Sequence, residues 1–326
     1  MEFTCTEPKR LDTAMSEALE LPRNQIEKLI KNIGVSVNGK AVKKSSLKLS
    51  NGDVVTYDFV VAQEEASTYE VDFDIEVLYE DEDILVVNKP PLLTVHGAPS
   101  VKEATLVDWL KKRGISLSTI SGEERHGIVH RIDKETSGAL VIAKNNEAHL
   151  ALSKQLEDKS MGRYYLALID VPLKENMIID LPIARNLNNR LKMAVMKEGR
   201  MAKSAFCKLL PSLDEKKELI AVKLFTGRTH QIRVHLSALS RHILGDSLYG
   251  FKSQNDTIPR VMLHAYVLYL RHPRTGQFMQ INAPLMDDFE QYLTKNFNKE
   301  QLHEKIKFDS IIGCFDAYVG WLRKDS

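Results

Sequence analysis

The chain has 326 residues, of which 43% are hydrophobic and 27% are charged, and it contains only 16 glycines and 11 prolines. This composition suits about two globular domains and excludes wholesale disorder and fibrous architectures. The formal net charge of +1 hides an uneven distribution, because residues 21–50, 185–208 and 223–241 are locally basic while residues 63–87 hold ten acidic residues and no basic one. Separate basic segments favour a polyanionic partner, although charged runs are also common on solvated faces.

The sequence shows no sign of export or membrane insertion. The N-terminus has no apolar segment of signal-peptide length, and no apolar run approaches the roughly 18 residues of a membrane helix. Cys5, Cys207 and Cys314 are far apart and form no Cys-x-x-Cys pair. This spacing argues against a disulfide framework and against a cysteine-rich zinc site. We therefore expect a cytoplasmic protein that does not contact membranes.

The first 60 residues or so have the pattern of a small separate module. Apolar residues recur at helical spacing in residues 11–30 and predict two short helices. Val35–Val37 alternates and ends in Asn38-Gly39, which is a hairpin signal. We expect a helix-helix-hairpin module over residues 1–62 and an acidic linker over residues 63–74.

Strand signals dominate the rest of the chain. Strands are predicted at residues 84–87, 128–132, 139–143, 164–169, 220–225 and 262–270. Helices are predicted only at residues 105–113, 146–156 and 230–239. Because strands and helices do not alternate regularly, we expect an α+β domain over residues 75–297 with a largely antiparallel sheet. Residues 298–326 form a C-terminal extension.

The densest polar cluster lies in residues 126–138. If residues 128–133 are extended, Arg131 and Asp133 share one face of a strand that ends in a turn. Loops held by such a scaffold often carry function. Taken alone, however, an aspartate in this place is more often a simple turn or ion-pair residue.

A second cluster, residues 226–233, joins a predicted strand to a predicted helix. Arg228 lies at this turn, where free backbone N–H groups and a guanidinium suit a carboxylate or a phosphate. The same pattern also fits a phosphate-binding turn that takes no part in catalysis. The spacing of a P-loop is absent.

Metal and hydrolase chemistry find little support. His126 and His130 are four residues apart and His230 and His235 five, but no third ligand is evident. The chain has no Gly-x-Ser-x-Gly element of a serine hydrolase. We expect no bound metal.

Five ordered segments resemble the RluA-type pseudouridine synthases, which isomerise uridines in ribosomal and transfer RNA. The resemblance covers roughly residues 75–285 and lies in Val87-Asn-Lys-Pro90 with Val95-His96, Gly127 to Gly138 around His-Arg-Ile-Asp, Arg163-Tyr-Tyr-Leu-Ala167, Thr226 to His235 with Gly245-Asp246 and Tyr249-Gly250, and Leu263-His-Ala265. The N-terminal module resembles a small RNA-binding domain found in a small-subunit ribosomal protein. The resemblance implies a pseudouridine-synthase fold with flanking helices.

The resemblance also implies roles for individual residues. Asp133 corresponds to the catalytic aspartate, Tyr165 to the tyrosine that packs on the base, and Arg228 to the basic residue that pairs with the aspartate. Arg131 resembles the arginine that enters the RNA stack, and Leu263 is the candidate for an apolar wall of the uracil pocket. Further candidates for RNA binding are Lys89, His130, Arg23, Lys28, Lys43 and Lys44.

Three positions depart from the family pattern. Ile132 replaces the usual leucine, Leu92 stands where glycine is common, and Gly97 stands where proline is common. The first change conserves volume, whereas the other two affect the loop at residues 90–99 and bear on substrate choice. The C-terminal extension, with Phe315, Tyr318 and Trp321, either packs on the core or contacts RNA, and we expect packing.

In the implied reaction, the bond between the sugar and a ring nitrogen of uracil is replaced by a bond between the sugar and a ring carbon. This change is redox-neutral, so we expect no metal and no organic cofactor. Asp133 can attack the sugar, add to the base, or remove a sugar proton to give a glycal, and the sequence does not decide among these routes. We expect a monomer that acts on large-subunit ribosomal RNA. A synthase specific for transfer RNA, or a catalytically silent RNA-binding or ribosome-assembly factor, remains an alternative.

Overall fold

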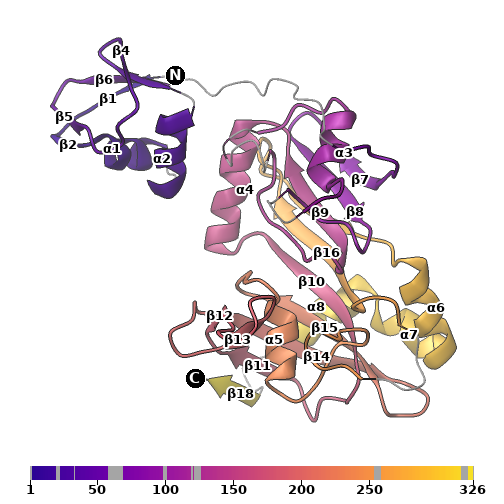
Figure 1. Cartoon of the computed structure of the whole chain (residues 1–326). Helices are drawn as coiled ribbons and strands as arrows, with labels where there is room; N and C mark the ends of the chain where they lie inside the picture. Colours follow the sequence, from indigo (N-terminus) through magenta and orange to yellow (C-terminus); the bar gives the residue numbers. More distant parts are fainter. Residues whose placement is uncertain are drawn as a thin grey trace.

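The computed structural model describes residues 2–19, 23–32, 34–57, 69–97, 101–118, 120, 126–252, 258–316 and 322–325. Figure 1 shows a small N-terminal module, residues 2–57, beside a larger domain. Of the acidic linker expected at residues 63–74, residues 63–68 lie outside the described part of the chain. Among the described residues, no helix has the length and apolarity needed to cross a membrane.

The N-terminal module contains the two predicted helices and the predicted hairpin. Its elements are α1 Leu11–Ala18 and α2 Arg23–Asn32, a sheet in the order β1 Glu2–Thr4, β6 Val54–Tyr57, β3 Val35–Val37 and β4 Lys40–Val42, and a pair formed by β2 Lys9–Arg10 and β5 Lys48–Leu49. Asn38 and Gly39 form the β3–β4 turn with φ values of 50° and 76°, the left-handed region that favours these residue types. The amide of Asn38 also bonds Asp53 and Val54, which fixes the turn on the sheet.

The larger domain is built on one ten-stranded sheet. Its strands in chain order are β7 Glu76–Glu80, β8 Ile84–Lys89, β9 Ser137–Ala143, β10 Gly162–Ile169, β11 Met177–Asp180, β14 Lys203–Pro211, β15 Glu218–Leu224, β16 Leu263–Arg271, β17 Phe278–Asn282 and β18 Leu322–Asp325. A separate hairpin is formed by β12 Ile183–Arg185 and β13 Met193–Val195. Long apolar runs such as β8, β9 and β10 are buried along their whole length, which explains why both faces of these strands read as hydrophobic.

The strand order is β18-β11-β14-β15-β10-β16-β9-β8-β7, with β17 beside β16. Only the β9–β16 and β11–β18 pairs of the described strands are parallel, so the prediction of a largely antiparallel sheet is confirmed. The β9–β16 contact is short and joins Ser137 to His264 and Gly138 to Ala265. Gly138 has a φ of +113°, and a Cβ there would collide with the backbone of Ala265. Only glycine fits this close approach.

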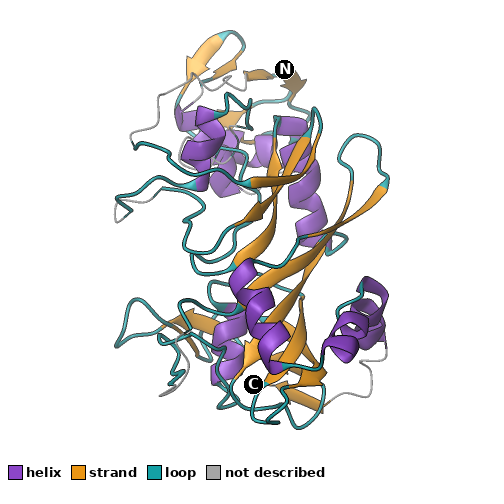
Figure 2. Ribbon diagram, turned by 90° about the vertical axis from the view of Figure 1, so that its right-hand side faces the viewer, coloured by secondary structure: helices purple, strands orange, loops and turns teal. Residues whose placement is uncertain are grey.

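In the described part of the larger domain, six helices flank the sheet: α3 Leu106–Lys112, α4 Asn146–Asp158, α5 Gln231–Ser237, α6 Asp287–Asn296, α7 Lys299–Lys305 and α8 Phe308–Asp316. The helices predicted from sequence correspond to α3, α4 and α5. Figure 2 shows the long strands running through the middle of the molecule with helices on either side. The largest apolar cluster lies around β10, β14, β15 and β16 and includes Phe289 and Phe315 from the C-terminal helices.

The strand predicted at residues 128–132 is wrong. These residues form an irregular segment with one isolated bridge between Ile128 and Ile142, on the side of β9 that β16 leaves unpaired beyond Gly138. The alternation of faces nevertheless holds: Ile128, His130 and Ile132 are buried while Arg131 is exposed. An extended backbone alone is therefore enough to direct Arg131 and Asp133 away from the core.

The cysteines also differ from the expectation that they form no disulfide. Cys207 on β14 and Cys314 on α8 are joined by a disulfide, whereas Cys5 is free and buried. Their Cα atoms are 6.4 Å apart although 107 positions separate them in the chain. Sequence spacing does not reveal this pair, because it depends on how α8 packs against the sheet.

The C-terminal extension packs on the larger domain, as predicted. Ile311 and Phe315 of α8 are fully or almost fully buried, and the Phe315 ring lies 5.4 Å from that of Tyr164. Tyr318 and Trp321 lie outside the described residues.

Candidate active site

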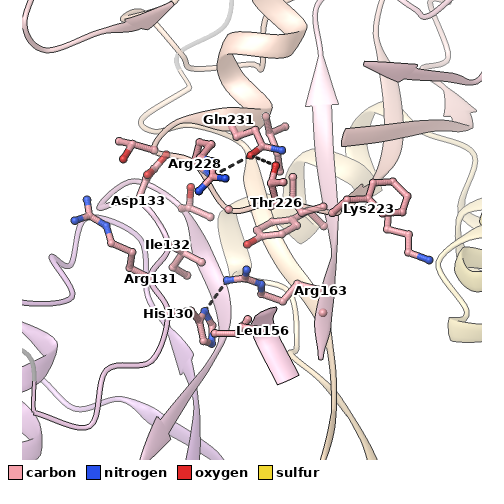
Figure 3. Close-up of a pocket in the computed structure, with 18 of the residues that line it drawn as sticks. His130, Arg131, Ile132, Asp133, Leu156, Arg163, Lys223, Thr226, Arg228 and Gln231 are labelled. Atoms are coloured by element: carbon pink, nitrogen blue, oxygen red, sulfur yellow. Dashed lines mark hydrogen bonds between the residues drawn. The ribbon is translucent and has the colours of Figure 1, made fainter. Parts of the chain in front are cut away.

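A cavity of about 500 Å³ opens where β10, β15 and β16 meet the segment before β9. It is lined by residues 129–133, by Arg163 and Tyr165 of β10, by residues 223–233 after and along β15, and by Leu263 of β16. Figure 3 shows these side chains converging from separate elements. The cavity thus brings together residues from four of the five segments that carried the sequence resemblance.

Asp133 lies at the mouth of this cavity with 18% of its side chain exposed. Its backbone carbonyl accepts from the N–H of Thr136 at 3.1 Å, which closes the turn of residues 133–136 that leads into β9. One carboxylate oxygen lies 3.6 Å from Nη1 of Arg233. The carboxylate is therefore held on a tight turn beside a fixed positive charge.

Arg233 of α5 is almost fully buried and is itself anchored. Its Nε and Nη2 donate to the two carboxylate oxygens of Asp246 at 2.7 and 2.8 Å, and Glu135 lies 3.3 Å from Nη2. Its guanidinium also stacks on the ring of Tyr249 at 5.1 Å. Burial by itself lowers the pKa of Arg233, but the hydrogen bonds with Asp246 outweigh it and raise that pKa above its usual range.

The assignment of Arg228 as the partner of Asp133 is corrected by this geometry. Nε of Arg228 donates to the carbonyl of Met201 at 2.9 Å, and its backbone N–H donates to the side chain of Gln231 at 2.9 Å. Gln231 also accepts from Thr226, so the turn is closed by a side chain and does not present a row of free N–H groups (Figure 3). The charge partner is Arg233, five residues later in the same sequence segment.

Tyr165 and Leu263 form an apolar wall of the cavity. Both are almost fully buried, and both lie on neighbouring strands, since β10 pairs with β16. Burial raises the pKa of Tyr165, so its hydroxyl stays protonated. Ile132 is buried in the same apolar cluster as Tyr165 and Leu263. The pair suits a flat, uncharged ring.

His130 and Arg163 lie deeper in the cavity than Arg131. His130 is buried, and its Nδ1 accepts from Nη1 of Arg163 at 2.6 Å. Burial and the charge of Arg163 lower the pKa of His130 well below its usual value, which keeps the imidazole neutral. Arg131, by contrast, is exposed and points away from this pair in Figure 3.

Lys89 is fully buried and does not face the solvent. Its Nζ donates to the carbonyls of Pro90, Leu93 and Lys134 at 2.7, 2.9 and 3.1 Å. Burial lowers its pKa to about 7. These bonds tie the loop after β8 to the turn that carries Asp133, which is a positioning role and differs from the RNA contact suggested by sequence.

A possible cation cluster lies away from the cavity. Asp81, Asp83 and His272 offer ligand atoms within 4.8 Å of one another, the one such group among the described residues. Nε2 of His272 already bonds Asp81 at 2.7 Å, and Arg274 forms two 2.7 Å bonds with Asp83. These bonds hold the turn between β7 and β8 against the turn between β16 and β17. The histidine pairs considered from sequence do not belong to it.

Comparison with known proteins shows the family to which the chain belongs. Residues 83–238 match the family described as RNA pseudouridylate synthase, and residues 9–55 match the S4 domain. A Helicobacter pylori (strain J99 / ATCC 700824) protein named "Uncharacterized RNA pseudouridine synthase" is 48% identical over 320 residues, covering 96% of this chain and 97% of that protein. The chain belongs to the RNA pseudouridine synthase family.

Other RNA pseudouridine synthases extend the comparison. "Ribosomal large subunit pseudouridine synthase D" of Zymomonas mobilis is 36% identical over 291 residues, which cover 86% of this chain and 92% of that protein. The solved structure of "Human RNA Pseudouridylate Synthase Domain Containing 1" aligns with a TM-score of 0.55 and 25% identity over 71% of this chain and 94% of that chain. The family and the α+β fold expected from sequence are both confirmed.

The synthase presents part of its basic S4 surface to the solvent. Lys43 and Lys44 are exposed directly after β4. Arg23 is half exposed, but its Nη2 bonds the buried carboxylate of Asp12 at 2.9 Å and so also holds α2 against α1. Lys28 belongs to α2, and its side chain lies outside what the structure describes.

Proposed function

We propose that this synthase isomerises uridine to pseudouridine in large-subunit ribosomal RNA and that Asp133 is the reacting carboxylate. The observation that carries the proposal is the 3.6 Å approach of Arg233 to Asp133 at the mouth of a cavity walled by Tyr165. A carboxylate on a rigid turn, a fixed positive charge and an apolar wall are the groups that the reaction needs. Such groups act best when the scaffold holds them in place before the substrate arrives.

The target uridine has to leave its stack before its glycosidic bond can meet Asp133. Extrusion of a nucleotide costs about a few kcal/mol of stacking and pairing. Arg131 is exposed at the edge of the cavity, which suits a side chain that fills the vacancy in the RNA. Tyr165 and Leu263 then provide a surface on which the detached uracil turns while it stays bound.

Two observations support ribosomal RNA as the substrate. Lys43 and Lys44 are exposed in the S4 domain, which offers a polyanion a basic surface separate from the cavity. Relatives from Zymomonas mobilis and Nitrosomonas europaea carry the name ribosomal large subunit pseudouridine synthase D. Two separated contacts favour a large folded RNA over a short one.

The test is to map pseudouridines in ribosomal and transfer RNA from cells with and without the gene, and then to restore the gene as wild type or as Asp133→Asn. We expect one or a few sites in large-subunit RNA to disappear and to return only with the wild type. Asp214→Asn, a change of an exposed carboxylate in the β14–β15 turn, serves as the control and restores modification. Loss of sites in transfer RNA alone contradicts the substrate, and an unchanged map contradicts the activity. Modification by Asp133→Asn contradicts the role of Asp133.

A further inference from the structure

Arg163 is a buried arginine of the cavity that the chemistry described so far does not use. It lies on β10 two residues before Tyr165, so both side chains leave the strand on the same face. Only 8% of Arg163 is exposed. It lines the cavity together with Tyr165, Tyr269 and His130, and its Nη1 lies 2.6 Å from Nδ1 of His130.

The guanidinium of Arg163 is largely unsatisfied. Nη1 donates to the neutral imidazole of His130, Nε is buried without any acceptor, and Nη2 lies beside Gly227 without a bond to a described residue. No carboxylate among the described residues forms an ion pair with it. Arg233, the other buried arginine of the cavity, is bonded to Asp246 and lies near both Glu135 and Asp133. The two arginines therefore differ sharply in how their charge is balanced.

A buried cation without a counter-charge is expensive, and an unpaired buried donor adds to that cost. Proteins keep such a group where a partner arrives with the ligand. A phosphate of the RNA backbone is a poor fit, because the chain continues on both sides of the nucleotide and stays at the mouth of the cavity. The extruded uracil is the part of the substrate that reaches Arg163, and its two carbonyl oxygens are acceptors.

We propose that Arg163 is a catalytic residue that donates to a uracil carbonyl oxygen and stabilises the negative charge that the base gains during the reaction. This inference rests on the proposed function. When the bond between C1′ and N1 breaks, its electron pair goes to the uracil ring and its carbonyl oxygens, while Asp133 bonds C1′ or removes the 2′ proton. The bond between C5 and C1′ then forms, the C5 proton leaves, N1 gains a proton, and Asp133 is released or returns its proton.

The same charge appears on the ring and its oxygens if Asp133 instead adds to the base. Arg163 therefore acts in all three routes. A preorganised donor at a site of developing charge is a strong contributor to catalysis, because the cavity excludes the water that would otherwise screen it.

The first experiment compares Arg163→Met, Arg163→Lys and Lys216→Met in single-turnover assays with saturating enzyme. Arg163→Met is expected to lower the rate constant about 100-fold, as for the loss of one donor to developing charge, and to change RNA affinity less than about threefold. Arg163→Lys keeps the positive charge but lacks the planar guanidinium, so its rate constant falls less than that of Arg163→Met. Lys216 is an exposed cation in the β14–β15 turn and does not line the cavity. Lys216→Met is therefore the control for loss of a positive charge and keeps the wild-type rate constant.

The second experiment replaces the target uridine with 5-fluorouridine and measures cleavage of the bond between C1′ and N1. Fluorine withdraws electrons and makes the detached base a better-stabilised anion, so the wild type depends less on Arg163. We expect the deficit of Arg163→Met to shrink several-fold with this substrate. An equal deficit with both substrates overturns the proposal and assigns Arg163 to holding His130 in place.

Two further outcomes keep the test decisive. If Arg163→Met does not fold by circular dichroism, Arg163→Lys carries the same comparison of substrates. If wild-type protein forms no pseudouridine on any RNA, the proposed function has failed, whereas wild-type activity with an unaffected Arg163→Met rejects only the role of Arg163.

Discussion

Arg233 places Nη1 3.6 Å from the carboxylate of Asp133 while Asp246 holds its other nitrogen atoms. The position of the charge beside Asp133 is thus fixed by a second carboxylate that never meets the substrate. Arg228, which is nearer to the strand end, is turned to the carbonyl of Met201. The two arginines of this segment therefore differ in what they contribute.

A pair of conservative changes tests this difference. Arg233→Lys keeps the charge but cannot form the two bonds with Asp246, so the single-turnover rate constant is expected to fall about 10- to 100-fold. Arg228→Lys is expected to change the rate constant less than about threefold, with any effect confined to RNA affinity. Thermal unfolding of both variants checks that the fold is retained. A larger loss for Arg228→Lys than for Arg233→Lys returns the pairing role to Arg228.

The hydroxyl of Tyr165 provides a second prediction. Tyr165 is buried, and burial raises its pKa, so its O–H is a neutral donor within the cavity. Tyr165→Phe keeps the apolar wall and removes only this donor. We expect unchanged RNA affinity and a rate constant about tenfold lower, measured by filter binding and by single-turnover kinetics. An unchanged rate constant means that the hydroxyl is idle and that Tyr165 acts as a wall alone.

Leu92 has a φ of 64° and a side chain that is 55% exposed. A left-handed conformation costs a non-glycine residue about 1–2 kcal/mol, which exceeds the greater freedom that glycine gains in the unfolded chain. Leu92→Gly is therefore expected to raise the melting temperature by about 1–2 °C. Leu92→Ala keeps the backbone strain and is the control, without stabilisation. If the melting temperature of Leu92→Gly is no higher than that of Leu92→Ala, the backbone at residue 92 is not strained.

Buried histidines predict a loss of stability in mild acid. Burial is the largest cause that lowers the pKa values of His149, His235 and His264 to about 4, below the value of 6.5 for a free side chain. Between pH 6.5 and 4 these histidines are protonated in the unfolded chain but stay neutral in the folded chain. Stability is therefore complete above pH 6.5 and falls as the pH drops towards 4.

The size of this loss between pH 7 and pH 5 is on the order of 5 kcal/mol for the three side chains together. Urea unfolding at the two pH values measures it. His303→Gln, a change of an exposed histidine, leaves the pH dependence as it is in the wild type. A free energy of unfolding that is flat or rises towards pH 5 contradicts the prediction.

Sequence patterns predicted the central strands well, because β8, β9 and β10 are continuous apolar runs buried on both faces. They did not predict β11 to β13, which are short, or β14, which pairs with β15 across the turn at residues 212–217. The irregular segment at residues 128–132 looked like a strand because it shares the alternation of one. Tertiary pairing decides such cases.

The site was predicted in the same partial way. The sequence around Asp133 predicted a turn after this residue, and the structure has that turn, with Asp133 beside the cavity and Arg131 exposed. It did not show which arginine pairs with Asp133, since that depends on the phase of α5 after the left-handed residue His230. Asp246 and Arg163 lie in the sequence segments that resemble the family, but their burial and their partners depend on the folded chain.

The short parallel contact between β9 and β16 depends on Gly138. It places β9, which follows the turn of Asp133, directly against β16, which begins with Leu263. A methyl group added to Gly138 would collide with the backbone of Ala265 and push β9 away from β16. The turn of Asp133, which leads into β9, would then shift relative to Leu263, so a residue without a side chain keeps the proposed reacting carboxylate in place beside the cavity wall.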